Sequence, residues 1–258
     1  MRISNFLRLT FGVAMSCLIA FNATSAGMDK ALVKVGVNRN MNAELMSPEG
    51  AGPFPAILLM HTSGGLQSAD LLFAEHLVSE GYVVLVPSFM EAYRITAKTR
   101  ASTFTEYADA IYADFLSCLE DLKKNPKVNG KRIGAIGFSN GGYFALWLAA
   151  KGDVQAGVSY YGAISGAGTD KTLNRFRQSF NAKSSPVLIL HGSSDAVVRV
   201  EKATELDEIL SGSSSSHELH IYPGAEHRFE RDGGSVNDEA ASLAWLQTKA
   251  FLKGQLQQ

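Results

Sequence analysis

Residues 132–142 read Arg-Ile-Gly-Ala-Ile-Gly-Phe-Ser-Asn-Gly-Gly, and this stretch decides the fold. The run 132–138 is apolar enough for a buried strand, and 140–151 has the pattern of a helix. Between them lies G-x-S-x-G, a sharp strand-to-helix turn that exposes its serine as a nucleophile. Strand and helix crowd each other beside such a turn, so only glycine fits at 137 and 141. The stretch predicts Ser139 as a catalytic nucleophile, whereas a glycine-rich turn without catalysis is the alternative.

Strands and helices alternate on both sides of this turn. Further strands are predicted at 55–60, 82–86, 156–161, 187–191 and 218–222, and helices at 68–80, 104–124, 201–210 and 235–253. This alternation predicts a mostly parallel sheet covered by helices on both faces. Residues 32–37 and 43–46 precede the alternation and are expected to form an antiparallel edge hairpin. Ser235 and Asp238 fit a capping box at the last helix. We find no linker, so the sequence predicts one α/β domain without a large lid.

Ligands bind beyond the carboxyl ends of the strands in sheets of this kind. The loops after residues 60, 86, 138, 191 and 222 are therefore the expected location of the site.

A nucleophilic serine at such a turn needs an acid and then a histidine later in the chain. Asp195 follows the strand 187–191 directly, whereas Asp170 lies in an irregular stretch, and Glu201 and Asp207 are expected on a solvated helix face. His227 is the last of six histidines and lies in a turn-rich loop. The sequence predicts the triad Ser139, Asp195 and His227.

The negative oxygen that forms during acyl transfer needs two backbone N–H donors. One is expected from Asn140, at the start of a helix, where the helix dipole also favours negative charge. The other is expected from the loop 61–65, at Thr62 or Ser63, because Gly64 and Gly65 allow a close approach to the substrate. An ordinary strand-to-helix turn is the alternative for this loop.

Three segments resemble the dienelactone hydrolase family: G-F-S-N-G-G at 137–142, H-G-S-S-D at 191–195 and G-A-E-H-R-F at 224–229. The resemblance covers about residues 55–252. It implies an α/β-hydrolase fold and hydrolysis of a carboxylic ester or lactone, with no metal or organic cofactor. Dienelactone hydrolases proper use cysteine where this chain has Ser139, and glutamate where it offers His61, so dienelactone itself is in doubt as the substrate. His61 follows the strand that ends at residue 60 and is a candidate for substrate binding. In that family an arginine four residues after the histidine binds a substrate carboxylate, a role implied here for Arg231; a solvated Arg231 paired with Glu230 or Asp232 is the alternative.

The triad by itself does not separate an esterase from a peptidase or an acyltransferase on the same fold. A non-catalytic binding protein is the alternative from another class, and a broken triad would indicate it. All three triad positions are intact.

Composition indicates a folded protein with a small-molecule substrate. Hydrophobic residues make up 46% of the 258 residues, and the net charge is -1 with no basic stripe, which argues against a nucleic-acid partner.

The N-terminus reads as an export signal. Arg2 and Arg8, an apolar run over 9–21 and small residues before Gly27 predict a signal peptide at 1–26 and a mature domain at 27–258. An uncleaved anchor is the alternative, and the intact mass of the native protein distinguishes the two. The expected location is periplasmic or secreted, without stable membrane insertion after cleavage. Cys118 is then the one remaining cysteine and is expected to be a small buried hydrophobe.

Overall fold

The fold is centred on an eight-stranded sheet, seen in a computed structural model that describes residues 27–164 and 169–257. The predicted signal peptide lies outside the described residues, so export stays a prediction. In spatial order the strands are β1 (Met28–Val35), β2 (Met41–Pro48), β4 (Val83–Pro87), β3 (Phe54–Met60), β5 (Val128–Phe138), β6 (Ala156–Tyr160), β7 (Val187–Gly192) and β8 (His217–Tyr222). Strands β4 to β8 run parallel, while β1 and β2 form the predicted antiparallel edge hairpin. The predicted mostly parallel α/β fold is confirmed.

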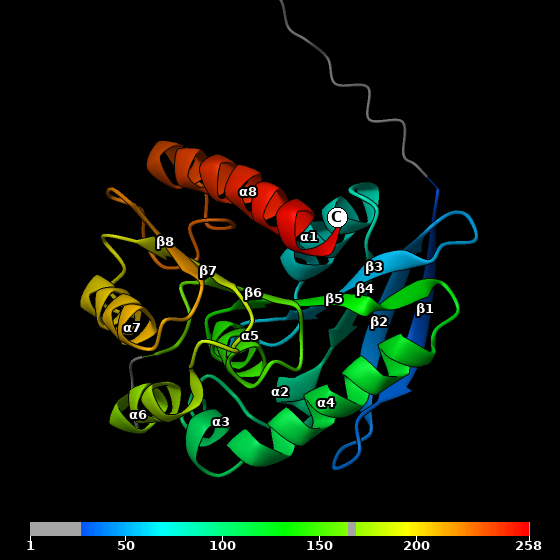
Figure 1. The fold of residues 1–258 in the computed structure, drawn as a ribbon, viewed down its shortest axis with the longest axis horizontal. Helices are drawn as coiled ribbons and strands as arrows, with labels where there is room; N and C mark the ends of the chain where they lie inside the picture. Colours follow the sequence, from blue (N-terminus) through cyan, green and yellow to red (C-terminus); the bar gives the residue numbers. More distant parts are fainter. Residues whose placement is uncertain (1–26, 165–168, 258) are drawn as a thin grey trace, which may run out of the picture.

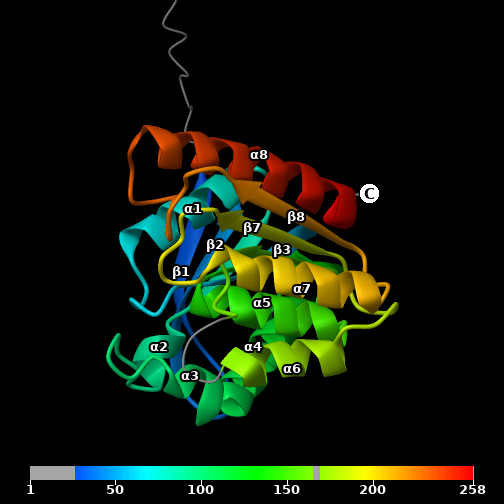
Figure 2. The same cartoon turned by 90° about the vertical axis from the view of Figure 1, so that its left-hand side faces the viewer.

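Helices cover both faces of this sheet (Figure 1). Their bounds are α1 (Ser68–Ser79), α2 (Phe89–Ala92), α3 (Ser102–Thr105), α4 (Ala108–Lys124), α5 (Asn140–Lys151), α6 (Thr169–Ser179), α7 (Val200–Gly212) and α8 (Ser235–Leu256). Helices α1 and α8 lie together on one face, and α4, α5 and α7 lie on the other, as the turned view also shows (Figure 2). Each face buries its own apolar cluster, which is why the central strands are apolar on both sides.

The parallel strands are in register where they end. Met60 pairs with Gly137, Phe138 with Tyr160, and Tyr160 with Leu190. The loops after β3, β5, β6 and β7 therefore emerge side by side at one edge of the sheet. This edge is where the sequence predicted the site.

Three local predictions were wrong. The helix expected over 104–124 is divided into α3 and α4, because the helical hydrogen-bond pattern is interrupted at Tyr107, whose N–H bonds to the Ser102 carbonyl oxygen at 2.9 Å. Thr103 of α3 is fully buried, and its Oγ1 accepts a hydrogen bond from Asn140 Nδ2. Helix α6 contains Asp170, which we had placed in an irregular stretch. The predicted capping box is absent, because Gly234, at φ 96°, is the N-cap and Ser235 is already helical.

Cys118 is fully buried in α4, as predicted. Burial raises the pKa of its thiol well above the usual range, so it stays protonated and unreactive. None of the helices in the described ranges is both long and apolar enough to cross a membrane.

Candidate active site

Ser139 lies at the turn between β5 and α5, with φ at 50°. Positive φ is strained for a non-glycine residue and is typical of functional turns. The flanking glycines make this turn possible: a Cβ at Gly137 would lie 2.1 Å from the Gly141 carbonyl oxygen, and one at Gly141 would lie 2.1 Å from the Met60 oxygen. The steric reason inferred from the sequence therefore holds at both positions.

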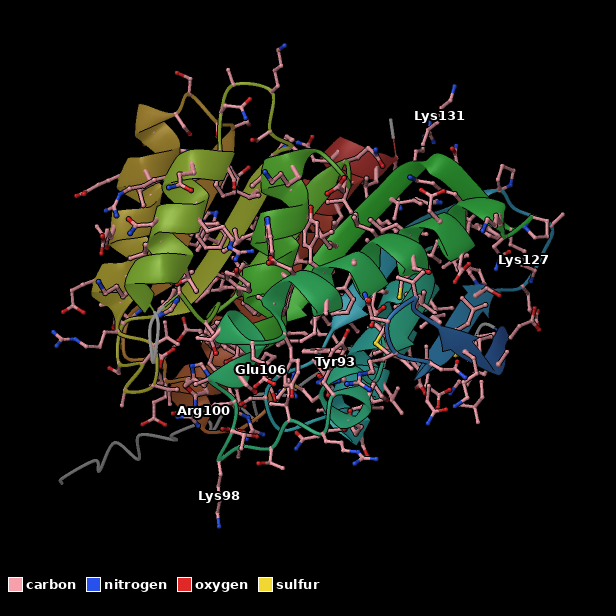
Figure 3. The ribbon with its side chains drawn as sticks, turned by 90° about the horizontal axis from the view of Figure 1, so that it is seen from below. Tyr93, Lys98, Arg100, Glu106, Lys127 and Lys131 are labelled. Carbon is pink, nitrogen blue, oxygen red and sulfur yellow. The ribbon has the colours of Figure 1, made fainter. Side chains whose placement is uncertain are left out.

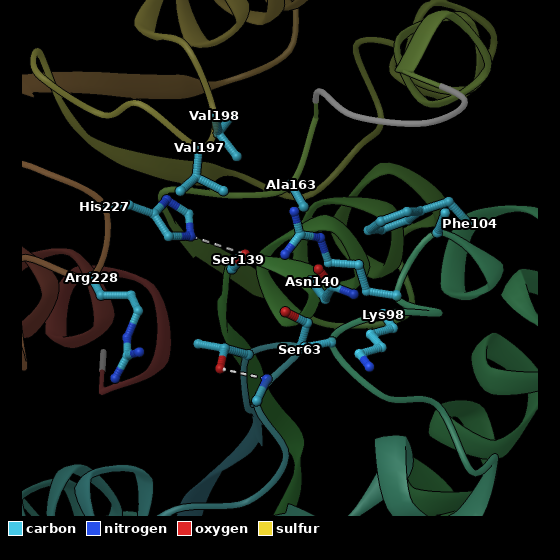
Figure 4. A pocket seen from close by; sticks show the side chains of 15 residues that line it. Ser63, Lys98, Phe104, Ser139, Asn140, Ala163, Val197, Val198, His227 and Arg228 are labelled. Carbon is cyan, nitrogen blue, oxygen red and sulfur yellow. Dashed lines mark hydrogen bonds between the residues drawn. The ribbon is translucent and has the colours of Figure 1, made fainter.

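The structure brings Ser139, His227 and Asp195 together (Figure 4 shows the serine and the histidine). His227 Nε2 lies 3.2 Å from Ser139 Oγ, and His227 Nδ1 lies 2.7 Å from Asp195 Oδ2. An ionised carboxylate only accepts hydrogen bonds, so Nδ1 carries the proton and Nε2 is left to accept the serine O–H. This is the geometry of an activated hydroxyl nucleophile.

Asp195 is held rigidly although its side chain is fully buried. Its Oδ1 accepts N–H bonds of 2.8 Å from both Val197 and Val198. Burial by itself would raise the pKa of this carboxyl, but the hydrogen bond and charge of His227 and the Val198 N–H outweigh it and lower the pKa. Asp195 is therefore ionised at neutral pH.

A second histidine lies beside this carboxylate without reaching Ser139. His191 is buried, and its Nε2 lies 2.8 Å from the Val198 carbonyl oxygen and 3.5 Å from Asp195 Oδ2. Burial lowers its pKa, so it is neutral and donates to that carbonyl. His191 supports the loop that carries Asp195.

The predicted oxyanion donors lie around the same pocket as Ser139. Asn140 is the first residue of α5, where the first N–H groups of a helix have no partner within it. In the loop after β3 the Thr62 carbonyl accepts the Gly65 N–H at 3.3 Å, and Thr62 Oγ1 accepts the Gly64 N–H at 3.1 Å. This tight turn presents Thr62 and Ser63 to the pocket.

The pocket has a volume of about 550 Å³ and a basic rim that we did not predict. Lys98, Arg100 and Arg228 line it, together with the apolar side chains of Phe104 and Val197. Among the described residues that line it, none is acidic. The sequence did contain a signal for this rim. The stretch 95–102, Ile-Thr-Ala-Lys-Thr-Arg-Ala-Ser, carries two basic residues and follows the strand ending at Val86, after which part of the site was expected.

Arg231 lies away from this pocket, and both expectations for it need correction. It does not line the pocket, and its side chain is only 4% exposed, so it is not solvated. It pairs with Glu230, as one expectation had it, but also with Asp70 at 3.0 Å. Asp232 pairs instead with Arg228.

His61, the other candidate for substrate binding, is also absent from the pocket lining. It is fully buried and stacks on Phe89, with ring centroids 4.3 Å apart. Its Nδ1 lies 2.8 Å from the Thr62 carbonyl oxygen, which supports the turn described above. Burial lowers its pKa, so it is neutral and donates to that carbonyl.

The fold and this site define a hydrolase of the α/β-hydrolase type. The family model for the dienelactone hydrolase family matches residues 41–256. The chain therefore belongs to the dienelactone hydrolase family, as the sequence motifs indicated, and hydrolysis of ester or lactone bonds is the enzyme class predicted for it.

Two named proteins illustrate the likeness. The chain is 25% identical over 231 residues to a Synechocystis sp. protein named "Putative carboxymethylenebutenolidase", covering 85% of this chain and 94% of that one. Its fold resembles a dienelactone hydrolase-like promiscuous phosphotriesterase from metagenomic libraries (TM-score 0.72, 21% identity, 88% and 98% of the two chains).

The fold also resembles an acylaminoacyl peptidase from Pyrococcus horikoshii (TM-score 0.71, 15% identity). The match covers 89% of this chain and 42% of the peptidase chain. Because both structural likenesses are below 25% identity, they show the fold alone.

Proposed function

We propose that the protein is a serine hydrolase that cleaves a carboxylic ester or lactone through an acyl-enzyme on Ser139. The observation that carries the proposal is the hydrogen-bonded chain Ser139–His227–Asp195 at a strained strand-to-helix turn. His227 Nε2 takes the proton as Ser139 Oγ attacks the carbonyl carbon. The N–H groups of Asn140 and of Thr62 or Ser63 stabilise the negative oxygen.

The remaining steps use the same groups in reverse. His227 returns its proton to the leaving alcohol oxygen as the ester bond breaks, which leaves the acyl group on Ser139. Water then enters and attacks the acyl carbon while His227 accepts one of its protons. The bond to Ser139 Oγ breaks as His227 passes that proton to Oγ, which releases the acid and restores the serine hydroxyl. Asp195 keeps the imidazole oriented and stabilises its positive charge in both halves. For a lactone the alcohol and the acid are two ends of one product.

Two alternative functions differ from this proposal in separate ways. A peptidase or acyltransferase would share the triad and differ in its leaving group or acyl acceptor. A non-catalytic binding protein would have no need for a continuous hydrogen-bonded chain ending at a strained serine.

A neutral fluorophosphonate tests this proposal, because it reacts with an activated serine and leaves a covalent mass on it. We expect intact mass to show one addition, located at Ser139 by peptide mapping. Hydrolysis of neutral p-nitrophenyl esters, with peptide amides as the comparison, should favour esters. An unlabelled Ser139 in folded protein contradicts the proposal.

The basic rim supports a preference for esters or lactones that carry a carboxylate. Lys98, Arg100 and Arg228 line the pocket that holds Ser139, and none of the described lining residues is acidic. Arg228 is paired with Asp232 at 3.1 Å, so Lys98 and Arg100 are the rim charges on which the preference depends. Figure 3 shows Lys98 and Arg100 at one end of the molecule and Lys131 at the other. Because Lys98 and Arg100 are exposed, salt should weaken their attraction for an anion.

Replacing both rim residues, Lys98→Gln with Arg100→Gln, should raise KM for a carboxylate-bearing ester roughly tenfold, about 1.4 kcal/mol. KM for a neutral ester of the same length should barely change, since it has no charge to attract. Lys131→Gln removes another exposed charge, which lies at the other end of the molecule, and serves as the control. Equal effects on both esters would contradict a role in charge selection.

A further inference from the structure

Three charged side chains form a buried ion cluster next to the loop that carries His227: Asp70, Glu230 and Arg231. Their side chains are 0%, 7% and 4% exposed. Arg231 Nη2 donates to Asp70 Oδ1 at 3.0 Å, and its Nε donates to Glu230 Oε1. The guanidinium carbon lies 4.9 Å from the ring centre of Phe138, the residue before the nucleophile. Arg231 is therefore held on several sides, outside the substrate pocket.

Tyr161 connects this cluster to the catalytic histidine. Its hydroxyl donates to the same Oε1 of Glu230 that Arg231 binds, and its ring centre lies 4.6 Å from that of His227. Burial and the Glu230 carboxylate hold the pKa of Tyr161 well above its usual range, so the hydroxyl keeps its proton. The backbone of Tyr161 is also fixed, with φ at 38° and its N–H bonded to the Leu190 oxygen at 2.7 Å.

The cluster also reaches the other wall of the site. Asp70 lies in the first turn of α1, and its Oδ2 accepts the Gln67 N–H at 2.9 Å. Helix α1 directly follows the turn that presents Thr62 and Ser63. The Arg231 guanidinium therefore links helix α1, which follows the turn at Thr62 and Ser63, to the loop that carries His227. Arg231 and its partner Asp70 are 161 positions apart in the sequence.

Charge and burial explain why the connection is rigid. Two carboxylates share one guanidinium, so each carboxylate depends on Arg231 to offset the cost of its burial. Buried ion clusters add little net stability compared with apolar packing, but they permit few alternative arrangements.

We propose that Arg231 is a positioning residue for His227, acting through Glu230 and Tyr161, rather than a residue that binds the substrate carboxylate. The proposal rests on the proposed serine-hydrolase function. It replaces the role that the family resemblance implied for this arginine, and it leaves charge selection to the basic rim. Loss of Arg231 should then slow every reaction of Ser139 that needs His227, whatever the charge of the reagent.

The test is the rate at which a neutral fluorophosphonate labels Ser139. In Arg231→Met we expect labelling at least tenfold slower than in wild type, and kcat lowered equally for neutral and carboxylate-bearing esters with KM little changed. In Tyr161→Phe, which keeps the ring and removes only the hydroxyl, we expect a smaller loss of the same kind. A tenfold rise in KM confined to the carboxylate-bearing ester, with the labelling rate unchanged, would overturn the proposal.

A triple variant separates positioning from simple stability, since Arg231→Met by itself leaves two buried carboxylates unpaired. Asp70→Asn, Glu230→Gln and Arg231→Met together remove all three charges and keep an acceptor for the Gln67 N–H. We expect its Tm to recover towards wild type while labelling stays slow. If both the Tm and the labelling rate of the triple variant return to wild-type values, the cluster has only a structural role. If wild-type Ser139 itself resists labelling, it is the proposed function that fails.

Discussion

Replacing Ser139 by alanine is expected to lower kcat for ester hydrolysis by about 10⁴-fold or more. Ser139 Oγ is the atom that would form the acyl bond, and a serine, its histidine and its acid act as one unit. The fold should be unaffected, because alanine tolerates φ of 50° no worse than serine and the lost hydroxyl contacts only His227 among the hydrogen bonds found for it. Steady-state kinetics with a neutral ester measure the effect, and circular dichroism checks the fold.

The fluorophosphonate provides the control for this variant. Ser139→Ala should acquire no covalent mass under conditions that label the wild type completely. A variant that keeps more than a tenth of wild-type kcat would show that another residue is the nucleophile. Because Cys118 is fully buried, it is not a plausible substitute.

The second large effect is expected from Gly141→Ala, which should destabilise the protein by at least about 3 kcal/mol. A Cβ at this position would lie 2.1 Å from the Met60 carbonyl oxygen, an atom of the central strand β3 that has no room to move. The sheet and α5 would have to separate beside the nucleophile. Urea unfolding followed by circular dichroism measures the loss.

Gly254→Ala is the matched control. Gly254 is also helical, in α8, but a Cβ there has no neighbour within 4 Å. The change should stabilise the protein by about 0.5–1 kcal/mol, because alanine loses less backbone freedom in a helix than glycine does. Similar effects of the two variants would mean that the crowding at Gly141 is not what requires glycine.

The fold class and the meeting of Ser139, Asp195 and His227 at one place were predictable because they depended on local patterns and strand direction. An apolar run followed by Gly-x-Ser-x-Gly specifies a turn by steric exclusion alone. Asp195 and His227 could be placed because parallel strands must end at one edge, so residues just beyond them meet there. The pairing of His227 with both partners followed from chain order and hydrogen-bond chemistry, without knowledge of distant contacts.

The lining of the pocket and the environment of Arg231 were decided by tertiary structure. Lys98 and Arg100 come from a segment without regular structure between α2 and α3, and nothing local says which way such a segment folds. Arg231 looked like a loop arginine beside two acids. Its buried partner Asp70 lies 161 residues away.

Sequence by itself therefore determined the α/β sheet, the strained serine turn and the candidates for acid and base, since short-range sterics and strand direction dictate them. The tertiary structure sets which charges line the pocket and which are buried. That choice depends on the balance between losing hydration and gaining a partner, and the partner is known only once the chain has brought distant segments together.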